Sequence, residues 1–130
     1  MKAENIKFKA KRLDGKGWVC GYFYEENGNT YIIENRQKES KLNRNLTYQV
    51  DPSTVCMFTG LKDCEDNEIW EGDLLQTHIK AAIYEVIWHE KIRGFIIKVY
   101  TNDRSSPNLL SYELQAYKYK IVGNKFDKEK

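Results

Sequence analysis

The side chains with the most chemical potential are the cysteines, the histidines and a run of carboxylates in the middle of the chain. Nucleophilic catalysis needs a nucleophile, a base and an orienting group that meet in space. Cys20 or Cys64 could pair with His78 or His89, but no spacing in the sequence brings them together. The chain also lacks the GxGxxG, Walker A and HExxH patterns. We therefore predict that the protein is not an enzyme and that it uses no cofactor.

The same residues do not indicate a metal site. The chain has an odd number of cysteines, Cys20, Cys56 and Cys64, and no two of them form a CxxC pair. We therefore expect reduced thiols in a reducing compartment. The carboxylates between residues 63 and 68 are dense enough to suggest a cation. An EF-hand loop, however, needs a glycine after its third ligand and a bidentate glutamate farther along, and both are absent. The prediction is that no metal is bound.

Charge is distributed unevenly along a chain whose net charge is only +2. Residues 1–16 hold six basic side chains against two acidic ones, whereas residues 59–76 hold six acidic against one basic. Either these are solvated faces, or a basic surface meets a phosphate backbone. The second interpretation would place stacking aromatics, Trp18, Tyr22 and Tyr24, beside a candidate nucleic-acid surface. The basic residues of that surface are Lys7, Lys9, Lys11 and Arg12.

The elements that would position these side chains are mainly strands. Nine Tyr, five Phe and three Trp favour pleated, half-buried surfaces. Alternation of apolar and basic residues over 6–11, and the Asn-Gly hairpin signal at residues 27–28, predict a three-stranded meander over 5–34. Ser106 and Pro107 predict the start of one helix, over 107–115. Further strands are predicted at 46–50, 54–58, 74–79, 82–89, 95–100 and 119–122.

The segment from residue 59 to residue 74 is best explained as a structural turn. Its two glycines give the backbone freedom to turn sharply. Its aspartates have short carboxylates that can accept backbone N–H bonds, and its apolar residues would anchor both ends in the core. The motif residues are Thr59, Gly60, Leu61, Asp63, Ile69, Trp70, Glu71, Gly72 and Asp73, with Leu74 as a further anchor.

These residues also carry a resemblance. The string VDPSTVCMFTGLKDCEDNEIWEGDLLQ, residues 50–76, closely resembles the signature of YopX-like proteins, small products of bacteriophages and prophages. The opening KFKAKRLDGKGWVCGYFYEENGNTYII and the closing YKYKIVGNKFD resemble that family too. Two positions depart from its pattern. Met57 stands in place of Gln, and Glu65-Asp66 stands in place of Asn-Gly, which predicts a looser turn after Asp63.

The resemblance implies a mostly β fold whose C-terminal half forms an SH3-like small barrel, and it brings no catalytic residue. We expect one domain over residues 1–130, with a β meander over 1–55 and the barrel over 56–130. The expected fold class is mostly β, and α+β at most. The expected function is a non-enzymatic phage or prophage accessory protein, a protein-interaction module with a host or phage partner or with itself. The alternative is weak nucleic-acid binding through the basic first strand.

Two further expectations concern where the protein acts. No apolar run is long enough to span a bilayer and no secretory signal is visible, so we expect a cytoplasmic protein without a membrane partner. The loops at residues 35–45 and 101–107 are the segments in which we would first look for binding.

Overall fold

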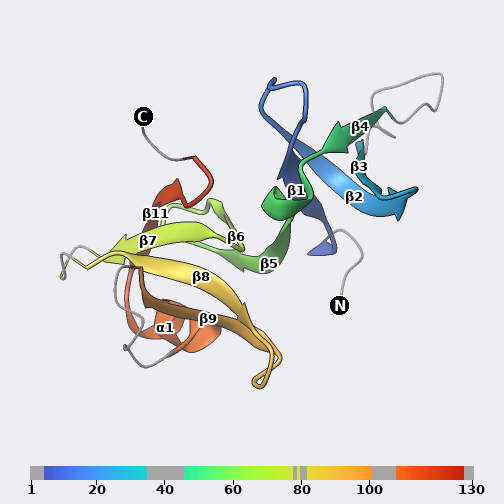
Figure 1. Cartoon of the computed structure of the whole chain (residues 1–130). Helices are drawn as coiled ribbons and strands as arrows, with labels where there is room; N and C mark the ends of the chain where they lie inside the picture. The colour runs from blue at the N-terminus through green and yellow to red at the C-terminus, as the bar shows by residue number, and fades with distance from the viewer. Residues whose placement is uncertain (1–4, 35–45, 78, 80–81, 101–107, 128–130) are drawn as a thin grey trace. The chain divides into compact units, whose positions relative to one another are not determined.

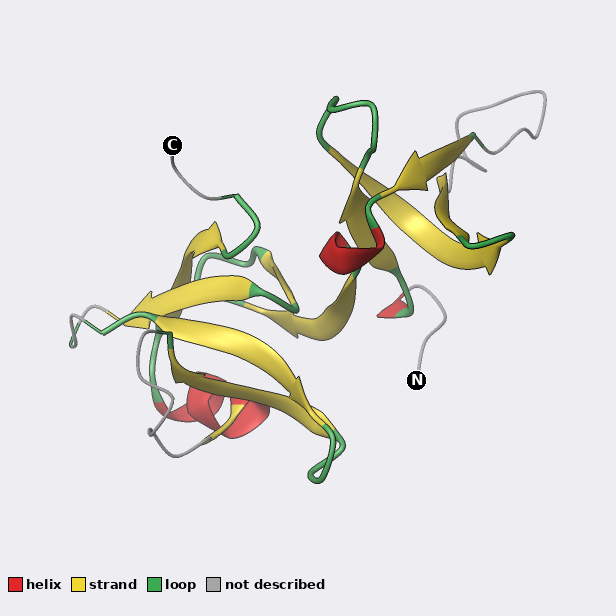
Figure 2. Cartoon of the chain, viewed as in Figure 1, coloured by secondary structure: helices red, strands yellow, loops and turns green. Residues whose placement is uncertain are grey.

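The computed structural model describes residues 5–34, 46–77, 79, 82–100 and 108–127, and every structural statement below concerns those residues (Figure 1). The chain is mostly β, with two antiparallel sheets and one short α-helix, which confirms the predicted fold class (Figure 2). It divides into two compact units, Met1–Phe58 and Thr59–Lys130. The single domain over 1–130 stays a prediction, and so does its division at residue 55. Both binding loops of the prediction lie outside the described residues.

The first unit is built on the predicted meander. β1 (Phe8–Lys11), β2 (Trp18–Glu26) and β3 (Asn29–Glu34) pair in sequence, and β4 (Thr47–Val50) pairs with β3. The β2–β3 turn places Asn27 and Gly28 at φ of 53° and 81°, as the Asn-Gly signal predicts. A 3-10 turn, η2 (Pro52–Thr54), follows β4, and its N-cap Asp51 accepts from the Ser53 N–H at 3.0 Å.

The side chains on one face of this sheet form the core of the unit. Ala10, Val19, Ile32 and Val50 are buried together there, with partly buried Phe8, Tyr48 and Val55 around them. Gly21 also faces inward, and it lies so close to the β3 backbone that a Cβ at this position would fall on the carbonyl group of Ile33. The sheet also curls toward itself, because an antiparallel bridge joins Arg12 to Val50 of β4. The side chains of alternate residues on each strand point to the opposite face, which is described below.

β5 (Cys56–Lys62) crosses the boundary between the units. Its first residues pair with β1, with Met57 opposite Phe8 and Cys56 opposite Lys9. Its later residues belong to the second unit, where Thr59 Oγ1 donates to the Ile69 carbonyl at 2.7 Å. The strand order of this sheet is β4-β3-β2-β1-β5-β6, where β6 is Glu68–Trp70.

The second unit contains a five-stranded sheet of order β10-β9-β8-β7-β11. Its buried cluster comprises Ile69, Leu75, Val86, Ile97, Leu110 and Tyr119. The described strand pairings do not close this sheet into a barrel, and the SH3-like barrel stays a prediction. The elements are β7 (Asp73–Thr77), β8 (Tyr84–His89), β9 (Gly94–Val99), β10 (Asn108–Leu109), α1 (Leu110–Ala116) and β11 (Tyr119–Asn124).

The helix prediction was right about the presence of a helix and wrong about its start. α1 begins at Leu110 rather than at residue 107, because Asn108 and Leu109 pair with Ile97 and Ile96 of β9 as a short strand. Leu109 is the N-cap, and no side chain caps the helix there. The predicted cap at residues 106–107 lies outside the described residues.

Candidate functional site

Four aromatic side chains share the face of the first sheet that is opposite its core. Trp18, Tyr22 and Tyr24 alternate along β2, and Tyr31 stands opposite Tyr24 on β3. We call these four residues the aromatic face. The exposed fractions of Tyr22 and Tyr24 are 43% and 37%. The rings of Tyr24 and Tyr31 are stacked, with centroids 5.1 Å apart and planes at 21°.

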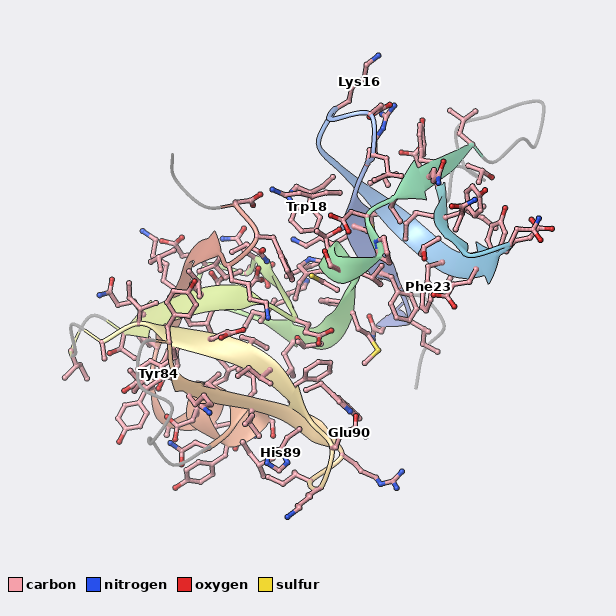
Figure 3. All side chains as sticks on the ribbon, viewed as in Figure 1. Lys16, Trp18, Phe23, Tyr84, His89 and Glu90 are labelled. Atoms are coloured by element: carbon pink, nitrogen blue, oxygen red, sulfur yellow. The ribbon has the colours of Figure 1, made fainter. Side chains whose placement is uncertain are left out.

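Phe23, between two of these tyrosines in sequence, belongs to the other side of the sheet. Its ring meets Phe8 edge-on with a centroid distance of 4.7 Å (Figure 3). The labelled side chains of Trp18 and Phe23 both come from β2, and their register places them on its two faces. The aromatic face is therefore a consequence of strand alternation, and its rings are not part of the core.

Three lysines from β1 and its preceding residue lie on the same face. Lys9 and Lys11 are opposite Cys20 and Trp18 in register, and their ammonium groups lie 4.8 and 5.6 Å from the Trp18 ring centroid. Lys7 lies 4.7 Å from the ring centroid of Phe58. Strand alternation thus brings together the lysines and aromatics that the sequence proposed as neighbours.

Arg12 does not join these lysines, which corrects the predicted four-residue surface. Its guanidinium lies 4.2 Å from the ring centroid of Tyr48, a residue that packs against the core side of the sheet. The same group forms an ion pair with Asp14. The physical reason is the period of the strand, because Arg12 has the parity of Phe8 and Ala10 and therefore faces as they do.

Two further residues of β2 lie on the same side of the sheet as the aromatic face. Cys20 is exposed between Trp18 and Tyr22 on β2. Glu26, at the end of the same strand and with the same parity, adds one negative charge. On that side of the sheet, Lys9 and Lys11 of the neighbouring β1 outnumber the acidic Glu26 of β2.

The family motif forms a different kind of structure, centred on the Asp63 carboxylate. Asp63 Oδ1 accepts the N–H groups of Glu65 and Asn67 at 2.9 and 2.8 Å. Its Oδ2 accepts the N–H of Ile121 in β11 at 3.1 Å. Asp66 adopts φ of 68°, and its N–H donates to the Asp63 carbonyl at 3.0 Å. The prediction of a looser turn was wrong: Asp66 takes the left-handed conformation and the turn closes.

These contacts act on the acidity of Asp63. Burial of the carboxyl group favours its neutral form, but the three backbone N–H donors favour the carboxylate and outweigh burial. The pKa of Asp63 is consequently lowered from 3.8. The negative charge of Asp63 thus stabilises the turn, and the hydrogen bond from the Ile121 N–H joins the turn to β11.

The second half of the motif is held by Asp73. Its Oδ2 accepts the Trp70 N–H at 2.7 Å, and its Oδ1 accepts from the Asn124 side chain at 3.0 Å. Gly60 and Gly72 have φ of 83° and 90°, which L side chains rarely adopt. Among the expected anchors Ile69 and Trp70 are buried, Leu61 packs against the core cluster, and Leu74 and Glu71 are half-buried. The fully buried residue of β7 is Leu75, which the sequence did not single out.

The residues considered for catalysis come from different elements of the described chain. Cys20 belongs to the first unit and Cys64 to the second, whereas Cys56 is buried. His89 lies at the end of β8, where its Nδ1 accepts the Ile92 N–H at 3.2 Å (Figure 3). His78 lies outside the described residues. No group of three or more metal-ligating side chains is found among the described residues.

Sequence reasoning missed two features of the second unit. Glu113 of α1 is buried and accepts a hydrogen bond from the Tyr119 hydroxyl at 2.7 Å. Burial, and then the hydrogen bond to Glu113, raise the pKa of Tyr119. The other feature is a hollow of about 280 Å³ beside exposed Cys64, to which Lys118 and Lys120 contribute. The alternation of side chains along β11 could have indicated that Tyr119 is buried, but no local sequence signal indicates that Glu113 is its hydrogen-bond partner.

The structure thus defines a mostly β protein with two units, a strand shared between them, and an aromatic face on which Tyr22 and Tyr24 are exposed. The family profile described as YopX protein matches residues 7–129. The chain therefore belongs to the YopX family, as the resemblance of its central motif predicted. No curated protein sequence matches it. No helix in the described part of the chain is long and apolar enough to cross a membrane.

Proposed function

We propose that this YopX-family chain is a non-enzymatic accessory protein of a bacteriophage or prophage, and that it acts in the bacterial cytoplasm as a binding module. The aromatic face is its binding surface. The observation that supports this proposal is the exposure of Tyr22 and Tyr24 on the side of the sheet that is opposite the core.

Exposed aromatic side chains on one face need an explanation. Tyrosine has a large apolar ring and a polar hydroxyl, which makes it well suited to surfaces that are alternately wet and covered. The core of the first unit is complete without these rings, since Ala10, Val19, Ile32 and Val50 are buried on the other side. Tyr24 stacks on Tyr31 across the hairpin, but the core does not need either ring, and a role in binding accounts for the exposure of Tyr22 and Tyr24.

The proposal is tested by capture from a lysate of the bacterial host with three tagged proteins. The wild-type chain is compared with Tyr22→Ser/Tyr24→Ser and with the control Tyr112→Ser, which alters an equally polar ring that is 65% exposed on α1. We expect the double variant to lose the captured species and the control to keep them. Equal capture by all three proteins would refute the aromatic face as the binding surface.

Self-association was part of the sequence-based expectation and can use the same face. Light scattering of the same three proteins measures it directly. An oligomer that dissociates only in Tyr22→Ser/Tyr24→Ser would identify a second copy of the chain as the partner. An oligomer that persists in all three proteins would place self-association elsewhere.

A further inference from the structure

We infer that the aromatic face binds single-stranded nucleic acid, with bases stacked on its tyrosines and phosphates drawn to the lysines of β1. This inference rests on the proposed function, since it names the partner of the same surface. It is argued from the spacing of the rings, from the charge beside them and from the composition of the face.

The rings are spaced as a platform for an extended strand. Tyr22 and Tyr24 are alternate residues of β2, so their positions are about 6.8 Å apart along the strand. Tyr31 is stacked on Tyr24, so each of these two rings keeps its other face for a base. Stacking on aromatic rings tolerates any base, because every base has a π face. The platform therefore fits successive unpaired bases without a fixed sequence.

The lysines supply the second part of a single-strand site. Lys9 and Lys11 lie next to Trp18 at one end of the aromatic row, and Lys7 precedes them on the same side of β1. An ammonium group over a ring keeps its charge and still contributes to the field around it. Proteins that bind single strands combine such positive charge with stacking rings.

The composition of the face favours a nucleic acid over a protein partner. Protein–protein interfaces are enriched in tyrosine and tryptophan but depleted in lysine. Here lysines accompany the aromatic residues on adjacent strands, and Glu26 is the acidic residue of β2 on that side. A duplex fits less well, since its bases are already stacked on one another and their faces are not accessible.

The direct test is fluorescence anisotropy with a labelled oligothymidylate of about 16 nucleotides, with the duplex of the same length as comparison. Loss of one stacked base should weaken binding about tenfold, so we expect Tyr24→Ser to raise Kd by about that factor. Tyr24→Phe keeps the ring and should bind like the wild type, which separates loss of stacking from loss of folding. Tyr112→Ser is the control and should also bind normally.

Salt dependence tests the part of the lysines. If three phosphates are neutralised, Kd should rise about 20-fold between about 50 and 200 mM salt, from the slope of about 0.7 per phosphate for single strands. Replacement of Lys9 and Lys11 by Gln should flatten this dependence. A dependence that is unchanged in this variant would overturn the assignment of the lysines.

A footprint locates the bound strand. Cys20 is exposed within the aromatic face, while Cys64 is exposed in the second unit and serves as the internal reference. We expect bound oligothymidylate to slow alkylation of Cys20 and to leave Cys64 unchanged. Binding without protection of Cys20 would show that the strand lies elsewhere and would overturn the inference.

The outcomes also separate this inference from the proposed function. If no oligonucleotide binds at low salt, while lysate capture still depends on Tyr22 and Tyr24 after nuclease treatment, then the partner is a protein and only the inference fails. If lysate capture is independent of both tyrosines, the proposed function fails as well.

Discussion

Replacement of Asp63 by Asn tests whether one carboxylate holds the central turn. The wild-type side chain accepts three backbone N–H groups, two within the turn and one from Ile121 in β11. The substituted side-chain amide has one acceptor oxygen, so its NH2 group must face at least one of these donors. A donor left without an acceptor costs about 1–3 kcal/mol, and the remaining bonds lose the strength that the charge gave them. We expect Asp63→Asn to lower the free energy of unfolding by about 2–4 kcal/mol.

The matched control is Asp66→Asn in the same turn. Asp66 is exposed, its contact with Lys62 spans 3.7 Å, and Asn tolerates the φ of 68° found there. An exposed pair of this kind contributes under about 0.5 kcal/mol. Both variants remove one negative charge from one turn, so the comparison cancels the change in net charge. Urea unfolding followed by circular dichroism provides the measurement, and similar midpoints for the two variants would refute our reasoning.

The dependence on pH provides a second readout for the same residue. The pKa of Asp63 is lowered in the folded chain, so its contribution to stability is present above the unfolded value of 3.8 and is lost as pH falls through the folded value. Acid below pH 3.8 should therefore destabilise the wild type more than Asp63→Asn. The difference between their free energies of unfolding should shrink there, and a constant difference would contradict the assignment.

The remaining predictions concern close packing and a buried hydrogen bond. Gly21→Ala should destabilise the first unit by about 3 kcal/mol or more, because the new Cβ meets the Ile33 backbone, while the control Gly123→Ala makes only an ordinary contact and should cost under about 1 kcal/mol. Tyr119→Phe should cost about 1–3 kcal/mol in urea unfolding, because it leaves the buried Glu113 carboxylate without its donor. Burial and Glu113 raise the pKa of Tyr119, so it should remain protonated at a pH of about 10, where a free tyrosine side chain ionises. Ultraviolet titration of Tyr119→Phe should therefore match the wild type in that range, and the loss of one tyrosine's signal there would contradict this.

The first sheet could be predicted from the sequence because its signals are local. Alternation over residues 6–11 and the Asn-Gly turn at residues 27–28 act between neighbours, and the structure follows both. The same alternation would have placed Arg12 away from the lysines if it had been carried one residue further. The aromatic face was accessible by the same means. Tyr31 was missed because its place beside Tyr24 depends on the register across the hairpin.

The errors arose where distant contacts decide the local structure. The Ser-Pro signal predicted a helix from residue 107, but pairing of Asn108 with Ile97 extends β structure to residue 109. The closed turn after Asp63 involves the N–H of Ile121, which is 58 residues away. No window of sequence contains both partners, so the change of Asn-Gly to Glu65-Asp66 looked more disruptive than it is.

The strand shared by the two units bears on how such a protein can be divided or recombined. A cut between Phe58 and Thr59 would pass through β5 instead of through a linker. Residues 56–58 would keep their pairing with β1 and residues 59–62 their place beside β6, but each piece would lose its continuation. Short strand ends of this kind fray, and the backbone groups that fraying exposes promote aggregation. Expression of either half alone should therefore give poorly soluble material. For the same reason, we expect the two halves of the gene to be inherited as one piece, with exchange between relatives tolerated in the surface loops and not at this boundary.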